Sequence, residues 1–398
     1  MKVVVLHNAY QQRGGEDVVV EAEVALLRDA GHDVHVEIVS NDGLQSPGRQ
    51  IATLAHVAWS SARYRWAKDL VATHRPDVVH VHNFFPRLTP AVHVGAADAG
   101  AAVVQTLHNY RLFCANALLL RDGKPCEQCL GRSSLPGIVH RCYRGSALGS
   151  AGVVAMGRSA RKPRWLDSVH RAIALTDFAK TKFERLGFAP ERLVVKPNFV
   201  AGVFPASPRR EGAVFIGRLS TEKGVDVLLS AWQELPDIPL TIIGEGPDER
   251  HLRAMAPANV RFLGALPASD VRAQLVQAKC LVMPSIWYET FGLTIIEAFA
   301  AGLPVVASRL GAMAELVRDG ANGRLFEAGN AKHLAAVIRE EFGSTSRLAA
   351  LGTKARQTYL ERFTPEVNLR RLEDIYRAAI AARSARLPEV GARVSSNA

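Results

Sequence analysis

Residues 280–308 read CLVMPSIWYETFGLTIIEAFAAGLPVVAS, and this stretch carries the pattern that decides the fold. An apolar run at 280–283 is followed by a turn, by a segment with Ile295, Ile296 and Phe299 on one side of a helix, and by a second apolar run at 305–307. Two such runs joined by a helical segment are typical of a βαβ unit. The stretch therefore predicts part of a parallel sheet covered by helices.

The same alternation extends over the rest of the chain. Apolar runs of strand length lie at 3–6, 34–39, 78–82, 103–107 and 172–175, and a second series lies at 213–216, 240–243, 260–263, 280–283 and 305–307. A chain of 398 residues, 48% of them apolar, is longer than one hydrophobic core usually serves. We therefore predict two Rossmann-like, doubly wound α/β domains that face each other across a cleft.

The domain boundaries follow from breaks in this pattern. Three prolines and a glycine in KPNFVAGVFPASPRR (196–210) predict the linker. We assign 1–197 to an N-terminal domain, 198–365 to a C-terminal domain, 366–383 to a helix that packs back on the N-terminal domain, and 384–398 to a disordered tail. The apolar run in MKVVVLHN is too short for a secretion signal or a membrane span, so we expect a cytoplasmic protein.

Two carboxylates stand near the start of the helix predicted in 280–308. Glu289 precedes this helix, and Glu297 lies about two turns further along. Side chains so placed can hold hydroxyl groups at two points of one elongated ligand, and the free amides of residues 291–293 would form an anion site. The same spacing also suits a helix cap at Glu289 and a surface acid at Glu297, because glutamate is common in helices.

A second candidate turn, GRLSTEKG at 217–224, directly follows the apolar run at 213–216. Arg218 offers a planar fork and Lys223 a point charge, the two kinds of cation that hold phosphate oxygens. The order of a Walker loop is absent, and the chain contains no D-x-D, which would suggest carboxylates holding a metal on a nucleotide diphosphate. We therefore expect fixed cations, without a metal, to neutralise a diphosphate. Two ordinary surface charges are the alternative.

The N-terminal half holds weaker signals. Gly14 and Gly15 precede a predicted helix, where paired glycines permit positive φ and close approach of the backbone to a ligand, or simply a turn. His108 closes the strand at 103–107, a position that suits either a catalytic or a structural histidine. His80 and His82 alternate along another strand. The sequence offers them no third metal ligand, so we interpret them as packing residues.

Together with DVVHVHNFFPRLTP (77–90), VVKPNFV, IIGEGP and GAMAELVRDGANGRLF (311–326), these motifs resemble the GT-B retaining glycosyltransferases of the family 4 type, formerly called group 1. The resemblance covers nearly the whole chain. It implies metal-independent transfer of a hexosyl-type sugar from a nucleotide-diphosphate sugar, such as a UDP- or GDP-sugar, to a saccharide or lipid-linked acceptor. The N-terminal domain would bind the acceptor and the C-terminal domain the donor.

The resemblance also implies roles for single residues. Glu289 would hold the transferred sugar and Glu297 the ribose, while Arg218 and Lys223 would bind the diphosphate. His108 would lie beside the reacting sugar. The other donor-site residues implied by the resemblance are Gly15, Gly264, Phe291, Gly292 and Leu293. The rival functions are another GT-B activity, such as a sugar phosphorylase or a nucleotide-sugar epimerase, and a non-catalytic basic binder.

Four of the five cysteines fall at 114, 126, 129 and 142, spaced C-x11-C-x2-C-x12-C. A C-x2-C pair with two flanking cysteines is a credible structural zinc set in a protein with reduced thiols. The predicted ligands are Cys114, Cys126, Cys129 and Cys142. The outer spacings fit no standard zinc module, so buried or incidental thiols are the alternative.

The formal charge of +11 is concentrated in one region. The stretch 121–171 contains ten Lys and Arg against three Asp and Glu, a difference of +7. Such a stretch favours an anionic partner, for example the inner face of a membrane, although a solvated basic surface has the same composition. Without aromatic residues interleaved among the basic ones, we expect no nucleic-acid partner.

Overall fold

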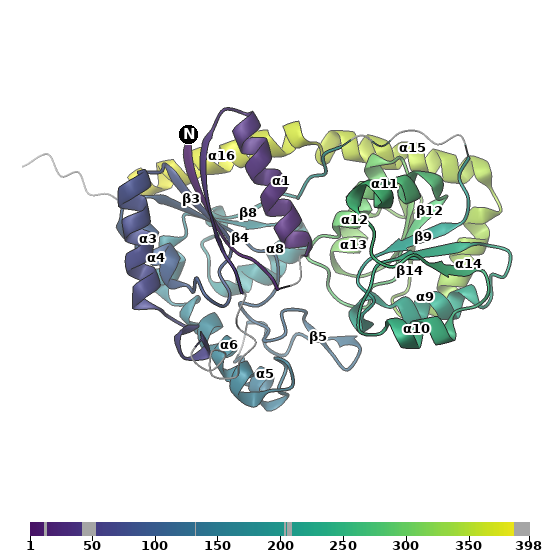
Figure 1. Ribbon diagram of the computed structural model, residues 1–398, viewed down its shortest axis with the longest axis horizontal. Coiled ribbons are helices and arrows are strands. Elements are labelled where there is room, and N and C mark those ends of the chain that lie inside the picture. Colours follow the sequence, from purple (N-terminus) through teal and green to yellow (C-terminus); the bar gives the residue numbers. More distant parts are fainter. Residues whose placement is uncertain (12–13, 42–52, 132, 203, 205–208, 386–398) are drawn as a thin grey trace, which may run out of the picture.

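The computed structural model describes residues 1–11, 14–41, 53–131, 133–202, 204 and 209–385, which form two α/β domains (Figure 1). The N-terminal sheet has the strand order β2-β1-β3-β4-β7-β8, and the C-terminal sheet has the order β11-β10-β9-β12-β13-β14. Every strand pair in both sheets is parallel. The predicted pair of doubly wound parallel-sheet domains is confirmed.

The N-terminal domain contains the five predicted strands and a sixth, β8, whose three residues are too few to give a pattern. The strands are β1 (Lys2–Asn8), β2 (Asp33–Val39), β3 (Val78–Asn83), β4 (Ala102–Thr106), β7 (Arg171–Ala174) and β8 (Leu193–Val195). The helices described in this domain are α1 (Gly15–Asp29), α3 (Ser61–His74), α4 (Ala91–Asp98), α5 (Leu135–Val139), α6 (Ala147–Ser159), α7 (Pro163–Ser168) and α8 (Asp177–Phe183).

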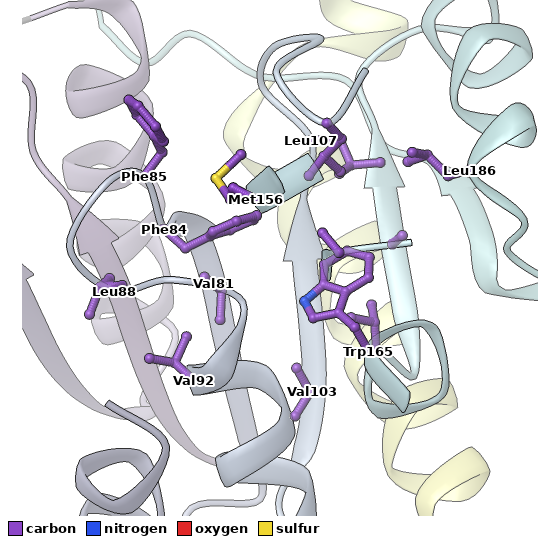
Figure 2. Close-up of a cluster of buried hydrophobic side chains, with 14 of the residues drawn as sticks. Val81, Phe84, Phe85, Leu88, Val92, Val103, Leu107, Met156, Trp165 and Leu186 are labelled. Atoms are coloured by element: carbon purple, nitrogen blue, oxygen red, sulfur yellow. The ribbon is translucent and has the colours of Figure 1, made fainter. Parts of the chain in front are cut away.

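Two helices that follow the cysteines are rooted in the core of the N-terminal domain. Met156 of α6 and Trp165 of α7 lie in one buried cluster with Val81 of β3 and Val103 of β4 (Figure 2). The chain between β4 and β7 therefore leaves the sheet, forms a small antiparallel hairpin and α5, and returns to the sheet through α6 and α7. The hairpin strands are β5 (Leu120–Arg121) and β6 (Lys124–Pro125).

The C-terminal domain contains its five predicted strands and adds β14. The strands are β9 (Ala213–Ile216), β10 (Leu240–Ile243), β11 (Val260–Phe262), β12 (Cys280–Met283), β13 (Val305–Ser308) and β14 (Gly323–Phe326). The helices are α9 (Val225–Trp232), α10 (Glu249–Met255), α11 (Ala268–Gln277), α12 (Leu293–Ala300), α13 (Gly311–Leu316), α14 (Ala331–Phe342) and α15 (Thr345–Arg362).

The last helix, α16 (Pro365–Ser384), crosses back to the N-terminal domain, as its yellow ribbon shows in Figure 1. Pro365 suits the first helical position, where its missing N–H has no intrahelical acceptor to lose. Leu372 and Tyr376 of α16 are fully buried in a cluster with Val3 and Val5 of β1. From residue 386 onward, the tail predicted at 384–398 lies outside the described residues.

The interdomain connection begins later than predicted. We placed the linker at 196–210, but Lys196 is only 1% exposed and its ammonium lies 2.8 Å from Glu23 Oε2. The charge that marks Lys196 as a linker residue in the sequence is instead neutralised inside the N-terminal domain. Residues 203 and 205–208 of the predicted linker lie outside the described residues.

Candidate active site

A cleft of about 580 Å³ lies between the two domains, within the size range of small-ligand sites. Its walls come from the start of α1, the turn after β4, and the turns after β9 and β12, that is, from the carboxyl ends of parallel strands. The predicted site residues that line it are Gly15, His108, Arg218, Lys223, Glu289, Phe291, Gly292 and Leu293.

The two strongest sequence motifs meet in an ion pair. Lys223 Nζ lies 2.6 Å from Glu289 Oε1, and Ser285 Oγ donates to the same oxygen at 3.0 Å. The Lys223 ammonium also lies 5.4 Å from the centre of the Trp287 ring. The Glu289 carboxylate is almost fully buried, whereas Arg218 is exposed at the edge of the cleft. A cationic turn and an acidic turn thus share one face of the cleft.

Gly224 allows these two turns to approach each other. Its φ of +65° favours glycine, and a Cβ atom there would lie 2.2 Å from the carbonyl oxygen of Pro284. The neighbouring Ile286 amide donates to Glu222 O at 3.0 Å. Lys223 therefore reaches Glu289 because a glycine removes the side chain that would hold the turns apart.

The start of α12 presents backbone amides to the cleft. Gly292, with φ +95°, is the residue before the first helical turn, and Leu293 and Thr294 follow it on the cleft wall. The first N–H groups of a helix have no intrahelical acceptor, and the helix dipole favours negative charge there. The predicted anion-binding arrangement is therefore present as geometry, beside Lys223.

Two predicted donor residues, Glu297 and Gly264, are not among the residues that line the cleft. We expected Glu297 two turns into the helix, but α12 begins only at Leu293, which places Glu297 about one turn in. Burial raises the pKa of Glu297 to about 7, against a lowering effect of Arg272. Gly264, with φ +70°, accepts a hydrogen bond at its carbonyl from the Gly244 amide at 2.8 Å.

His108 is joined to the acidic turn across the domain boundary. Thr290 Oγ1 donates to the carbonyl oxygen of His108 at 2.7 Å, and Thr176 Oγ1 donates to Thr290 O at 3.2 Å. The residue next to Glu289 therefore fixes the backbone of His108. The cleft is closed at its base by hydrogen bonds between the domains rather than by apolar packing alone.

The imidazole of His108 is held by a second histidine. His108 Nε2 lies 3.0 Å from His82 Nδ1, and His82 Nε2 lies 3.3 Å from Glu23 Oε1. A carboxylate only accepts, so a neutral His82 carries its proton on Nε2 and accepts from His108 Nε2–H. This arrangement leaves His108 Nδ1 as an acceptor. Burial, and then the proximity of His82 and His7, holds the pKa of His108 well below its usual range.

Behind these histidines lies a buried charged network that the sequence analysis missed. Glu23, His80 and His82 offer atoms close enough together to hold a metal ion. The Lys196 ammonium, however, already lies 2.8 Å from Glu23 Oε2, so a cation is present without a metal. Burial alone would raise the pKa of Glu23, but Lys196 and the two imidazoles hold it well below its usual range. His80 and His82 are therefore more than packing residues.

Glu16 forms another feature of the N-terminal wall. Its carboxylate accepts from Tyr10 OH at 2.9 Å and from Asn109 Nδ2 at 2.9 Å, and Asn109 Oδ1 accepts from the Arg111 amide at 3.1 Å. The sequence carried a signal for this pair of acids: Glu16 and Glu23 are seven residues apart on α1, about two helical turns, and so share one face.

The glycine pair departs in one respect from its prediction. Gly14 has a φ of −123°, which other residues also adopt, and neither Gly14 nor Gly15 is among the residues with positive φ. A Cβ atom on Gly15 would meet nothing within 4 Å. Gly15 therefore leaves open space on the cleft wall at the N-terminus of α1, rather than permitting an unusual backbone conformation.

Comparison with known proteins agrees with this architecture. Residues 13–201 match the sequence family Glycosyltransferase Family 4, and residues 204–358 match the family Glycosyl transferases group 1. A phosphatidyl-myo-inositol mannosyltransferase of Mycolicibacterium smegmatis is 28% identical over 340 residues, which cover 79% of this chain and 77% of that protein. The enzyme of the same name from Mycobacterium leprae is 33% identical over 216 residues, or 49% of this chain and 56% of that protein.

Among solved structures, the Anabaena protein HepE in complex with UDP aligns with a TM-score of 0.66 at 20% identity. The alignment covers 94% of this chain and 99% of that chain, so both domains and their relative arrangement are matched. The two family matches meet near the domain boundary, and the cleft lies where their halves face each other. The chain therefore belongs to the group 1, or family 4, glycosyltransferases of the GT-B fold, and it is an enzyme of that class.

Proposed function

We propose that this enzyme transfers a hexosyl-type sugar from a nucleotide-diphosphate sugar to a saccharide or lipid-linked acceptor, with retention of anomeric configuration and without a metal ion. The observation that carries the proposal is the Lys223–Glu289 ion pair, which faces His108 across the cleft. One member of the pair suits a phosphate and the other suits sugar hydroxyls. The pair therefore marks the junction of diphosphate and sugar.

The donor diphosphate would bind between Arg218, Lys223 and the first amides of α12. These groups offer two cations and a helix N-terminus directed at one place, which suits an anion of more than one charge. On binding, the phosphate would share Lys223 with Glu289 and leave the carboxylate free to accept from sugar hydroxyls. Fixed cations would then stabilise the leaving diphosphate. We expect transfer to persist in excess EDTA.

Retention requires the acceptor to attack the face from which the diphosphate leaves. Glu289 is held by Lys223 and Ser285 at the edge of the donor site, which suits a residue that orients the sugar rather than one that attacks it. His108 Nδ1, left as an acceptor by its bond to His82, would contact the same sugar from the other wall. NMR of the product anomer tests retention. An inverted product would contradict the assignment.

Replacement of Glu289 tests the proposed division of roles. We expect Glu289→Ala to lower kcat by about 10²–10³-fold, the usual cost of removing a polar group that stabilises the transition state, while nucleotide diphosphate still binds. Glu234→Ala, at an exposed acid of the same domain, is the control. Acceptor-dependent release of nucleoside diphosphate distinguishes transfer from phosphorylase or epimerase activity. Unchanged turnover in Glu289→Ala would remove the assignment.

The acceptor is proposed to be lipid-linked and reached at an anionic membrane surface. Leu135, Val139 and Leu148 are 51%, 74% and 66% exposed, and the first two lie one turn apart on α5, which packs on α6. Arg141 and Arg144 are exposed between them and Leu148. Exposed apolar side chains flanked by arginine suit the boundary between acyl chains and anionic headgroups. Among the described residues, no helix has the length and apolar character of a membrane span.

Vesicle sedimentation tests this surface. Binding to vesicles with anionic lipid should fall as salt rises, and it should weaken in Val139→Asp and Leu148→Asp. Leu360→Asp, at a residue 52% exposed on α15, is the matched control and should bind as the wild type does. Equal binding by all four proteins, or none to any vesicle, would exclude a membrane role for α5 and α6 and leave a protein partner as the alternative for this surface.

A further inference from the structure

The four clustered cysteines line one small cavity in the cysteine lobe, which we define as residues 111–165. The cavity volume is about 10 Å³, close to the space of one water-sized sphere. Its lining includes Cys114, Cys126, Cys129 and Cys142. All four are free thiols, as is the distant Cys280 of β12. A chain that brings four separate sulfur atoms to one cavity has made a site of suitable size for a single ion.

The local structure around the C-x2-C pair explains how two of the sulfurs converge. Asp122 and Gly123, with φ of 51° and 70°, join β5 to β6 in a two-residue turn whose positive φ values suit a tight hairpin. The hairpin brings the Cys126 amide to Leu119 O at 2.7 Å. The Leu130 amide then donates to Glu127 O at 2.9 Å, so Cys126 and Cys129 lie at the ends of one short turn.

The other two cysteines reach the same cavity from either side of this hairpin. The Cys142 amide donates to Gly137 O at 2.9 Å, which folds the end of α5 back toward the cluster. A Cβ atom on Gly137 would lie 3.7 Å from Cys129 Sγ, so α5 packs directly over the site. Cys114 Sγ lies 2.8 Å from Asn116 Oδ1, and the Asn116 side chain also donates to Leu120 O at 2.7 Å.

The surroundings of the cavity are electropositive. Arg121 is part of its lining. Burial raises the pKa of Cys129, while Arg161 and Arg121 act in the opposite direction. Four thiolates around a divalent cation carry a net negative charge, which nearby guanidinium groups would balance. The basic residues of this lobe therefore have a partner inside the protein as well as outside it.

Residues 114–142 have little regular structure to stabilise them. Their described elements are two strands of two residues each and one helix of five residues. Within these residues, Ala117, Leu119, Asp122 and Arg141 have positive φ, which costs free energy in residues other than glycine. A small region of this kind usually requires a disulfide or a metal to hold its fold. The C-x2-C turn favours the metal.

We propose that Cys114, Cys126, Cys129 and Cys142 bind one structural Zn²⁺ in tetrahedral geometry. Four Zn–S bonds form, the four thiols lose their protons to solvent, and Cys114 turns away from Asn116. The metal closes the loop 114–142. Because residues 116–118 line the cleft, it also fixes part of the wall that faces the donor site. The inference is independent of the proposed reaction.

Metal analysis of the full chain is the first test. We expect one equivalent of zinc in protein purified without chelator, and its loss in Cys126→Ser and Cys129→Ser. Cys280→Ser, at a buried cysteine outside the cluster, should keep the metal, and so should His140→Ala, which removes the histidine beside the cavity. If the serine variants fail to fold, cobalt exchange into the wild type gives the answer through the visible spectrum of tetrahedral thiolate Co²⁺.

Thiol titration gives an independent measurement. In the native protein, chelator should convert four protected thiols into reactive ones and increase proteolysis within 114–142. In denaturant with EDTA, and without reductant, all five thiols should react. Fewer than five would indicate a disulfide and overturn the proposal. So would purified protein without zinc whose four clustered thiols react freely before any chelator is added.

Discussion

The two walls of the cleft are built in different ways. The N-terminal wall, with Glu16 and His108, rests on a buried network of charged and polar side chains that includes Glu23 and Lys196. The C-terminal wall, with Arg218, Lys223 and Glu289, rests on backbone turns that glycines allow to pack closely. A Cβ atom on Gly244 would lie 2.0 Å from Gly217 O, which repeats on the next strand what Gly224 does beside Pro284.

This difference teaches where each wall is vulnerable. A buried network of charges is costly to disturb because every group depends on a partner that water cannot replace. A wall made of glycine turns is sensitive to added atoms and leaves its functional side chains comparatively free to be changed. Substitutions in the first wall should therefore affect folding, and substitutions in the second should affect binding.

The largest effect is expected from separating Lys196 and Glu23. Lys196→Met should lower the free energy of unfolding by about 3–5 kcal/mol, because it leaves a carboxylate buried without its cation. The double variant Lys196→Met with Glu23→Gln should recover part of that loss. Denaturant unfolding of the single and double variants measures the coupling. Simple additivity would show that the pair does not act as a unit.

Adding one methyl group to the second wall is expected to come next. Gly224→Ala places a Cβ atom against Pro284 O and should weaken nucleotide diphosphate binding by moving Lys223 from Glu289. Gly320→Ala is the matched control, since Gly320 has φ +74° but open space around it. The control should lose only the 1–2 kcal/mol, approximately, of a left-handed residue. Calorimetric titration compares the two, and equal affinities would contradict the packing argument.

Removing a functional side chain from the second wall should change affinity alone. We expect Arg218→Ala to weaken nucleoside diphosphate binding by about 1.5–3 kcal/mol, the range for hydrogen bonds to charged groups, with little change in stability. Binding of the nucleoside without phosphates should be nearly unaffected. Arg250→Ala, at an exposed arginine on α10, is the control. A large loss of stability in Arg218→Ala would break the distinction between the walls.

Acid should affect the N-terminal domain first. Burial lowers the pKa of His93 and His170 from 6.5 to about 4, so in this window the unfolded chain binds protons that the folded domain does not. Stability is therefore fully present above pH 6.5 and falls as the pH drops toward 4, by about 1.4 kcal/mol per pH unit for each group. Hydrogen exchange at pH 7 and pH 5.5 measures this by domain. Equal changes in both domains would contradict it.

The parts of this molecule that could be predicted are those that depend on neighbours in sequence. Apolar runs located the ten predicted strands, and short motifs identified residues on the cleft such as Lys223 and Glu289. Glu297 was misplaced because the start of α12 depends on Gly292, whose φ of +95° postpones the first helical turn. A motif records which residues occur, but not the residue at which a helix begins.

The buried partners could not be predicted because they are distant in sequence and chemically unremarkable there. Lys196 and Glu23 belong to different βα units, and Thr290 reaches His108 from the other domain. Each is an ordinary residue until the sheet order brings it beside its partner. Only Glu23, an acid on the apolar side of α1, carried a sign of burial.

The last helix has a consequence for the order in which the protein can fold during synthesis. Leu372 and Tyr376 of α16 complete the core under β1, and Tyr376 OH lies 2.8 Å from His80 Nδ1 in the buried network. The N-terminal domain leaves the ribosome first but lacks this part of its interior until the final helix has emerged. The domain made first is therefore completed last, and a truncated chain would expose it to degradation before the enzyme is finished.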